Sequence, residues 1–190
     1  MTFPQNRRGL LTFCLGFLFI FNCSVEETFN PDNVASLSVS IKGSESPYDR
    51  FVIDLSEVHV KVIDDENDPD CWWRISSSNP GIYDLQELVD GRQVLLTDAS
   101  SLPIGRIYAI KLVLGPNNYV IRQGSKIDLY TNSIQLGNLN MPVDRMISKG
   151  KSYGLDVEMD LSSSILDGPL DGQLILNPQV NYDFHDLKRQ

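Results

Sequence analysis

The amino-acid sequence predicts an all-β domain, an antiparallel β-sandwich, behind an N-terminal signal segment. Three observations favour this fold class. Apolar and polar residues alternate with a period of two over much of the chain after residue 33, which is typical of half-buried strands. Turn-forming residues separate these short segments, as they do in sandwiches. Helical spacing of apolar residues is confined to 83–91, which is too short to change the class.

The first 22 residues have the pattern of a secretion signal. Arg7 and Arg8 precede an apolar run of about 12 residues, Leu10–Phe21. A membrane-spanning helix needs about 20 apolar residues, whereas the core of a signal peptide needs about 7–15. The run is apolar all round and acidic residues follow it closely, which argues against a buried helix. We therefore expect residues 1–22 to be a signal peptide.

Cys23 closes the apolar run and indicates the kind of signal. Ile20-Phe21-Asn22-Cys23 resembles a bacterial lipobox, whose cysteine is lipidated and becomes the mature N-terminus. Phe21 and Asn22 are larger than the residues usual there, so cleavage near Cys23 and release of a soluble protein is the alternative. Lipid chains would anchor the protein stably, because each buried methylene contributes about 0.8 kcal/mol. We predict lipidation at Cys23 and attachment to a membrane.

Residues 23–33 are expected to form a lipidated N-terminus and a linker. Ser24-Val25-Glu26-Glu27 resembles the serine-and-acidic export signal of Bacteroidota surface lipoproteins. A merely solvated acidic linker is the alternative. The expected location is the cell envelope, lipid-anchored in the outer membrane, and exposure at the cell surface depends on this signal.

The β-domain is predicted over residues 34–183, with a polar tail over 184–190. Alternation begins with a strand at 35–42, and the buried parity changes within 51–63, so we expect a β-bulge or a break between two strands near Ser56 and Glu57. Pro116 and the asparagines after it predict a hairpin between residues 114 and 120. Further strands are expected at 72–75, 92–96, 107–114, 119–122, 126–130, 152–161 and 173–182.

Composition excludes one class of partner. The formal net charge is −9, and removal of residues 1–22 takes away two arginines and no acid, which leaves 14 − 25 = −11. Such a domain repels phosphate backbones, so nucleic-acid binding is not expected. Cys71 has no partner if Cys23 is lipidated, and a Cys23–Cys71 bridge is the alternative. We expect Cys71 to be a small buried hydrophobic residue.

The acidic stretch 64–70 is the candidate metal site. Calcium prefers several closely spaced carboxylate oxygens, which this loop offers, although the loop lacks the central glycine of an EF-hand. A hairpin tip made soluble by its charge is the alternative, and no other cofactor is expected. The candidate ligands are Asp64, Asp65, Asp68 and Asp70.

Trp72 and Trp73 are the candidate ligand-stacking residues. Adjacent residues on a strand point to opposite faces, so one tryptophan should enter the core. The other should be exposed, where it could stack on a sugar ring or a partner's side chain, or be covered by the acidic loop.

No residues are predicted to be catalytic. His59 and His185 are expected to be exposed, and Asp156, Glu158 and Asp160 share one parity, which is typical of a solvated sheet face. Catalytic groups need convergent geometry in a perturbed environment. We therefore do not expect an enzyme.

Three quoted stretches carry a family resemblance. These are "LSVSIKGSESPYDRFVIDLSEVHVKV", "IYDLQELVDGRQVLLTDASSLPIGRIYAIKLVLG" and "GLDVEMDLSSSILDGPLDGQLILNPQV". They resemble the domain of unknown function family 4382, found in exported bacterial proteins, many of them lipoproteins, and the resemblance covers about residues 34–182. It implies a Greek-key β-sandwich like those of transthyretin and immunoglobulins, and it supplies no catalytic residues.

Three functions stay open on this basis. The favoured one is a membrane-anchored lipoprotein whose sandwich is a binding or structural module for an envelope protein or a glycan. The second is an accessory subunit of a fimbria-like or nutrient-capture assembly, which would need an exposed strand edge or groove. The third, a glycan or ester hydrolase, would need His59 or two carboxylates to converge in a pocket.

Overall fold

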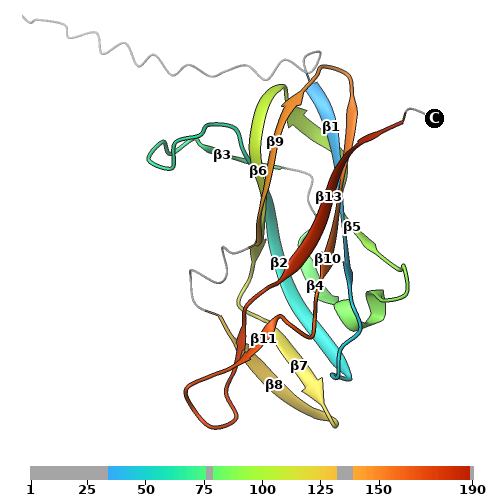
Figure 1. Cartoon of the computed structure of the whole chain (residues 1–190), viewed down its shortest axis with the longest axis vertical. Coiled ribbons are helices and arrows are strands. Elements are labelled where there is room, and N and C mark those ends of the chain that lie inside the picture. The colour runs from blue at the N-terminus through green and yellow to red at the C-terminus, as the bar shows by residue number, and fades with distance from the viewer. Residues whose placement is uncertain (1–33, 76–78, 132–138, 189–190) are drawn as a thin grey trace, which may run out of the picture.

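A computed structural model describes residues 34–75, 79–131 and 139–188 (Figure 1). Two β-sheets account for almost all regular structure in these residues, which confirms the predicted all-β sandwich class. The predicted signal and linker, residues 1–33, lie outside the described residues. Within the described residues, no helix has the length and apolar character needed to cross a bilayer.

The smaller sheet has four strands in the order β13-β10-β1-β5. Strands β1 and β10 run parallel, whereas the outer pairs are antiparallel. The sheet is therefore mixed, which alternation could not reveal, because a strand with one buried face has a period of two in either direction. Its strands are β1 (Val34–Gly43), β5 (Val94–Pro103), β10 (Ser152–Met159) and β13 (Val180–Leu187).

The larger sheet has nine strands, of which seven follow the order β11-β12-β8-β7-β2-β6-β9, while β3 and β4 pair with β2. It is also mixed, because β12 and β8 run parallel. Its strands are β2 (Arg50–Lys61), β3 (Trp72–Arg74), β4 (Gly81–Asp84), β6 (Gly105–Leu114), β7 (Tyr119–Arg122), β8 (Ser125–Tyr130), β9 (Leu139–Ile147), β11 (Ile165–Asp167) and β12 (Leu174–Leu176).

Strand β2 is central to the larger sheet. Strands β6 and β7 lie end to end along one of its edges, and β3 and β4 lie along the other. The hairpin predicted at 114–120 is therefore wrong: the chain bulges there and continues along β2. The bulge is held by Asp54, whose backbone oxygen accepts from Gly115 N at 2.7 Å and whose backbone N donates to Asn118 Oδ1 at 2.9 Å.

The bulge predicted near Ser56 and Glu57 is confirmed. The pairing of β2 with β6 shifts between Leu55 and Glu57. Leu55 before the shift and Val58 after it are both buried, so one extra residue keeps apolar side chains on the core face in both halves of β2.

Other expected boundaries differ from the structure. The strand predicted at 173–182 is two strands, β12 and β13, because the chain turns at Asn177, whose N donates to the backbone oxygen of Ser164 at 2.9 Å. Strand β13 continues to Leu187, so residues 184–187 belong to the sheet and not to a polar tail. The helical spacing at 83–91 yields only a 3₁₀ turn, η2 (Leu85–Leu88), capped by the Asp84 side chain. Strands β4, β9 and β11 were not predicted.

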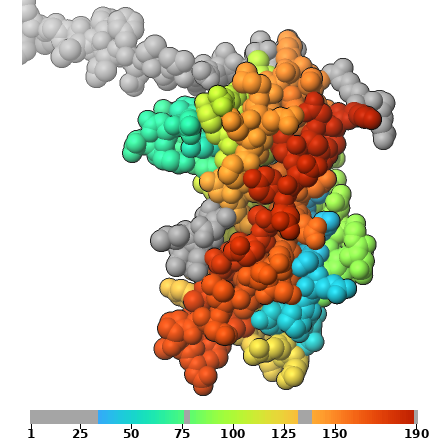
Figure 2. Space-filling model, in the orientation of Figure 1, coloured from blue at the N-terminus to red at the C-terminus, as the bar shows by residue number. Residues whose placement is uncertain are grey.

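The core fills the space between the two sheets. The smaller sheet contributes buried residues such as Leu37, Val39 and Leu155, and the larger sheet contributes Phe51 and Ile110 among others. Figure 2 shows β13, in red, crossing one face of the molecule and ending at the same end as the orange turn between β9 and β10.

The two long sides of the sandwich are closed by different contacts. On one side Tyr182 Oη in β13 donates to the Pro142 oxygen in β9 at 2.8 Å. On the other side Asn79 N donates to the Leu96 oxygen in β5 at 2.6 Å, directly before β4 begins. Both contacts tie an edge strand of one sheet to the other sheet.

Candidate functional site: a polar basin on the outer face of the larger sheet

The acidic loop leaves β2 at Lys61, and its first carboxylates bind that lysine. Lys61 Nζ lies 2.9 Å from Asp64 Oδ1 and 3.0 Å from Glu66 Oε1. The pKa of Lys61 is raised, mainly by its hydrogen bond to Asp64 and next by its hydrogen bond to Glu66. The pKa of Glu66 is lowered, mainly by its hydrogen bond from Lys61 and next by the hydrogen bond from the Trp72 indole. This end of the loop is therefore a network of opposite charges.

Two of the other loop carboxylates, those of Asp65 and Asp68, bind backbone groups of the loop. Asp65 Oδ1 accepts from Asn67 N at 2.9 Å, and Asp68 Oδ1 accepts from Asp70 N at 2.9 Å. Among the described residues, no three His, Cys, Asp or Glu side chains are grouped so that they could hold a metal ion. The geometry thus gives calcium at Asp64, Asp65, Asp68 and Asp70 no support, and the calcium site stays a prediction.

Neither tryptophan enters the core, so that expectation is wrong. Strand β3 is a three-residue strand beside the end of β2, and Trp73, which pairs with Val60, is 40% exposed. Trp72 lies on the outer face, where Lys111 Nζ sits 4.0 Å from the ring centroid and Glu66 accepts its indole N–H at 3.3 Å. One face of the Trp72 ring is thus covered by a cation. Ligand stacking on either ring stays a prediction.

His59 and His185 lie on different sheets. His59 Nε2 lies 2.5 Å from Glu57 Oε2, and Arg74 lies 3.0 Å from the other oxygen of Glu57. The His59 bond is the main cause of the lowered pKa of Glu57. His185 in β13 lies beside Gly154, and its Nδ1 is 3.3 Å from Asp183 Oδ2.

The three carboxylates of matching parity around β10 each bind a separate local partner. Asp156 Oδ1 accepts from Ser40 Oγ at 2.6 Å, and Glu158 pairs with Lys42 at 2.9 Å. Asp160 accepts from Ser163 N at 3.0 Å, and the two Ser163 bonds are the main cause of its lowered pKa. The structure therefore does not bring these carboxylates together with His59.

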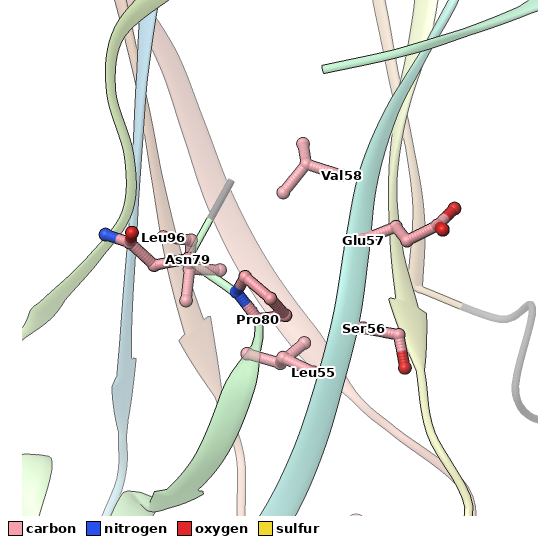
Figure 3. Close-up of a pocket in the computed structure, with 7 residues that line it drawn as sticks. All are labelled: Leu55, Ser56, Glu57, Val58, Asn79, Pro80 and Leu96. Atoms are coloured by element: carbon pink, nitrogen blue, oxygen red, sulfur yellow. The ribbon is translucent and has the colours of Figure 1, made fainter. Parts of the chain in front are cut away.

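A small cavity lies between β2 and the segment before β4 (Figure 3). Leu55, Val58, Pro80 and Leu96 point into it, while Ser56 and Glu57 point to the opposite face of β2, as the bulge requires. Its free volume is about 10 Å³, which is room for one water molecule and not for a ligand.

An open basin of about 480 Å³, lined in part by the predicted site residue Asp64, lies on the outer face of β2, β6 and β9. Its floor is a row of residues paired across three neighbouring strands, Lys61 in β2, Ala109 in β6 and Pro142 in β9. On its other edge β2 pairs with β3, where Trp72 lies opposite Lys61. Ala109 carries only a methyl group, so the row is lowest at its centre. The lining residues are Lys61, Asp64, Arg106, Tyr108, Ala109, Asn140, Pro142 and Asp144. We call these eight residues the basin.

An irregularity in β9 shapes the far wall of the basin. Between the pairs Ile107–Arg145 and Ala109–Pro142, β9 has one more residue than β6, and Asp144 takes a positive φ of 45°. This bulge directs Asp144 toward Arg106, and the two side chains form a bidentate pair at 2.7 and 3.0 Å.

The Arg106–Asp144 pair fixes the charges at this wall. The pair raises the pKa of Arg106 and lowers the pKa of Asp144, so both groups stay charged over a wide pH range. The Arg106 guanidinium also lies 5.4 Å from the centre of the Tyr108 ring. The basin therefore has one cation–carboxylate pair at each end, Lys61–Asp64 and Arg106–Asp144, with an aromatic ring, a proline and an amide between them.

The sequence predicted only part of this site. Asp64 was chosen as a candidate metal ligand, and Trp72 lies next to the basin in the floor row. Tyr108 belongs to the strand predicted at 107–114 and Arg106 directly precedes it, but alternation gave neither residue a special role. Asn140, Pro142 and Asp144 belong to β9, whose proline and bulge interrupt the period of two, so no pattern marked them.

Cys71 lies within the described residues, whereas Cys23 does not. Cys71 is buried, as expected for a small hydrophobic residue, and forms no disulfide with any described residue; burial raises the pKa of its thiol. Cys23 lies outside the described residues, so its lipidation and the Cys23–Cys71 bridge stay untested.

Comparison with known proteins identifies the family. The family model described as "Domain of unknown function (DUF4382)" matches residues 34–178, and the chain belongs to this family. No curated protein and no solved structure matches the chain significantly.

Proposed function

From this family membership and the geometry above, we propose that the protein is a lipid-anchored protein of the cell envelope whose sandwich is a non-catalytic binding module. The basin is its ligand site, and a glycan is its ligand. The signal pattern and Cys23 support the anchor. The basin supports the binding role.

The observation that carries the binding role is the composition of the basin. Sugars present hydroxyl groups that bridge paired donors and acceptors, and their C–H faces pack on aromatic and proline rings. The basin offers donors and acceptors together at each end, in Lys61–Asp64 and Arg106–Asp144, and an amide at Asn140. Tyr108 and Pro142 supply the apolar surface between them. An open basin on a flat sheet also suits one or two units of a longer chain.

A strand-exchanging accessory subunit is supported less well. Such a subunit needs a long, regular strand edge to accept a partner's strand. The outer edge of β5 is met by Asn79, which binds the backbone oxygens of both Leu95 and Leu96. The edge strand β9 is interrupted by Pro142 and by a bulge, devices that block strand addition.

A hydrolase is also supported less well. General acid and base carboxylates in glycosidases lie about 5–10 Å apart across a sugar-binding cleft. In the basin, Asp64 and Asp144 are each held by their own cation, and Arg106 lowers the pKa of Asp144, which does not suit a general acid.

The test is binding of envelope and dietary glycans to the full mature protein, first on an array and then by calorimetry. We expect Tyr108→Ala and Asn140→Ala each to weaken binding of the best glycan at least tenfold. The matched controls are Tyr130→Ala and Asn181→Ala, which remove exposed residues of the same types outside the basin, and these should bind normally.

Two results would contradict the proposal. One is a glycan whose affinity is unchanged in both basin variants. The other is turnover of a glycan or ester by the purified protein that is lost in His59→Ala, which would make the protein an enzyme.

A further inference from the structure

The described chain begins at one end of the sandwich, and several later segments meet there. Val34 pairs with Pro103, and its backbone oxygen accepts from Gly150 N at 2.8 Å. Leu187, the last residue of β13, pairs with Ser152 at the same level. Figure 1 shows the start of β1 and the ends of β9 and β13 at this end. We call it the anchor end: Val34, residues 103–106, residues 144–151, and residues 186–188.

The anchor end is basic although the domain is acidic. Its five cations are Arg106, Arg145, Lys149, Lys151 and Lys188, and its two carboxylates are Asp144 and Asp186, which gives a local charge of +3. The mature chain as a whole carries −11, so everything outside this end carries −14. Asp144 pairs with Arg106, and Asp186 lies 3.3 Å from Arg145 and 3.4 Å from Lys151. Lys149 and Lys188 are exposed and belong to none of the ion pairs among the described residues.

The same end exposes apolar side chains. Met146 is 68% exposed, Ile104 is 39% exposed and Leu187 is 38% exposed. Ile104 lies at the tip of the turn between β5 and β6, where Gly105 takes a φ of 116° that favours glycine. Cations surrounding exposed apolar side chains are the composition of surfaces that bind bilayer interfaces.

We propose that the anchor end is a membrane-docking surface, which lies against the anionic headgroups of the bilayer that holds the lipid anchor. This proposal rests on the anchoring proposed above, and two features select the bilayer as the occupant. A linker from Cys23 to Val34 reaches roughly 40 Å at most when extended, so the anchor end is the part of the domain held closest to the bilayer. The charge of +3 at the anchor end is attracted to the bilayer, and the charge of −11 on the rest of the domain is repelled from it. The linker itself carries Glu26, Glu27 and Asp32, so the attraction comes from the anchor end and not from the linker.

Docking would fix the orientation of the basin. Arg106 and Asp144 belong both to the anchor end and to the basin wall, so the basin opens beside the membrane surface and not at the distal tip. A ligand bound there is therefore a chain that lies along the envelope surface.

The first experiment measures docking on the anchored protein. The full lipidated chain is placed in nanodiscs of phosphatidylcholine with or without 30% phosphatidylglycerol, and amide hydrogen exchange is followed. We expect residues 144–151 to exchange at least threefold more slowly on the anionic discs, and the difference to vanish at 0.5 M salt. The double variant Lys149→Glu with Lys188→Glu should abolish the slower exchange on anionic discs. The control pair, Arg122→Glu with Lys126→Glu, makes the same change in charge in β7 and β8 and should still show the slower exchange.

The second experiment separates docking from anchoring. The mature chain from residue 23 with Cys23→Ser cannot be lipidated, and we expect it to float with phosphatidylglycerol vesicles at low salt but not with phosphatidylcholine vesicles. Lys149→Glu with Lys188→Glu should prevent flotation. Equal exchange on both kinds of disc, or flotation that the lysine variant does not reduce, overturns the docking proposal. An unmodified Cys23 in the wild-type protein purified from its host, together with flotation of the Cys23→Ser chain, overturns the anchor and leaves docking standing.

Discussion

At the scale of single residues, Asn118 is the side chain on which the bulged edge of β2 depends most. It is 2% exposed, accepts from Asp54 N at 2.9 Å and donates to the Gly115 oxygen at 2.7 Å. Alternation could not single it out, because its role is to satisfy backbone groups where the strand pairing is interrupted. The sequence signals at Pro116 and Asn117 were correct for a bend and wrong for a hairpin.

Asn118→Ala should therefore destabilise the domain. It leaves two buried backbone groups without partners, at about 1–3 kcal/mol each. For a domain of this size each kcal/mol lowers the melting temperature by about 2–4 °C, so calorimetry should show a fall of about 4–24 °C. Asn117→Ala is the matched control, because Asn117 donates to an exposed oxygen of Asp54 and its loss should change little. Equal shifts for the two variants would show that Asn118 does not hold the bulge.

At the scale of elements, the sequence predicted strands well wherever one face is buried and the period is unbroken. Strands β1, β2, β6, β7 and β8 fall within one or two residues of expectation, and the bulge in β2 was found because it changes the buried parity. Strand β9 was missed because Pro142 and the bulge at Asp144 break its pattern. Strands β4 and β11 are too short to show a period. The basin lies partly on β9, so it could not be found before the fold was known.

The position of the 3₁₀ turn η2 depends on a close approach between its Leu85 and Gly43 at the end of β1. It packs where β1 ends, and a Cβ on Gly43 would lie 2.5 Å from the Leu85 backbone oxygen and 2.9 Å from Leu161 Cδ1. Because a backbone atom cannot move aside as a side-chain tip does, Gly43→Ala should cost about 1–3 kcal/mol in urea unfolding. In Gly81→Ala the new methyl group meets only Tyr83 ring atoms at 3.5 Å, so its stability should stay within about 0.5 kcal/mol of the parent protein. A Gly43 variant as stable as the Gly81 variant would argue against close packing of η2.

At the scale of the whole molecule, the end of the sandwich where β1 begins differs in charge from the rest of the domain. The start of β1 lies at a basic, partly apolar end, while the rest of the domain is strongly acidic. The sequence predicted the acidic character and the anchor, but the cations of the anchor end come from three separate segments, and only the fold brings them together. The mixed sheet directions, β1 with β10 and β12 with β8, are likewise properties of the fold and not of any single strand.

The central claim of this account is that the chain is held in the envelope by a lipid on Cys23. The most direct measurement is the intact mass and N-terminal sequence of the protein purified from membranes of its host, beside the Cys23→Ser variant. We predict a mature chain that begins at residue 23 with acyl chains on Cys23, and a Cys23→Ser protein that leaves the membrane fraction when the membranes are washed with 0.5 M salt, which removes electrostatic docking. A mature chain with an unmodified Cys23, or a Cys23→Ser protein that stays in the salt-washed membranes after its signal is removed, would contradict the account.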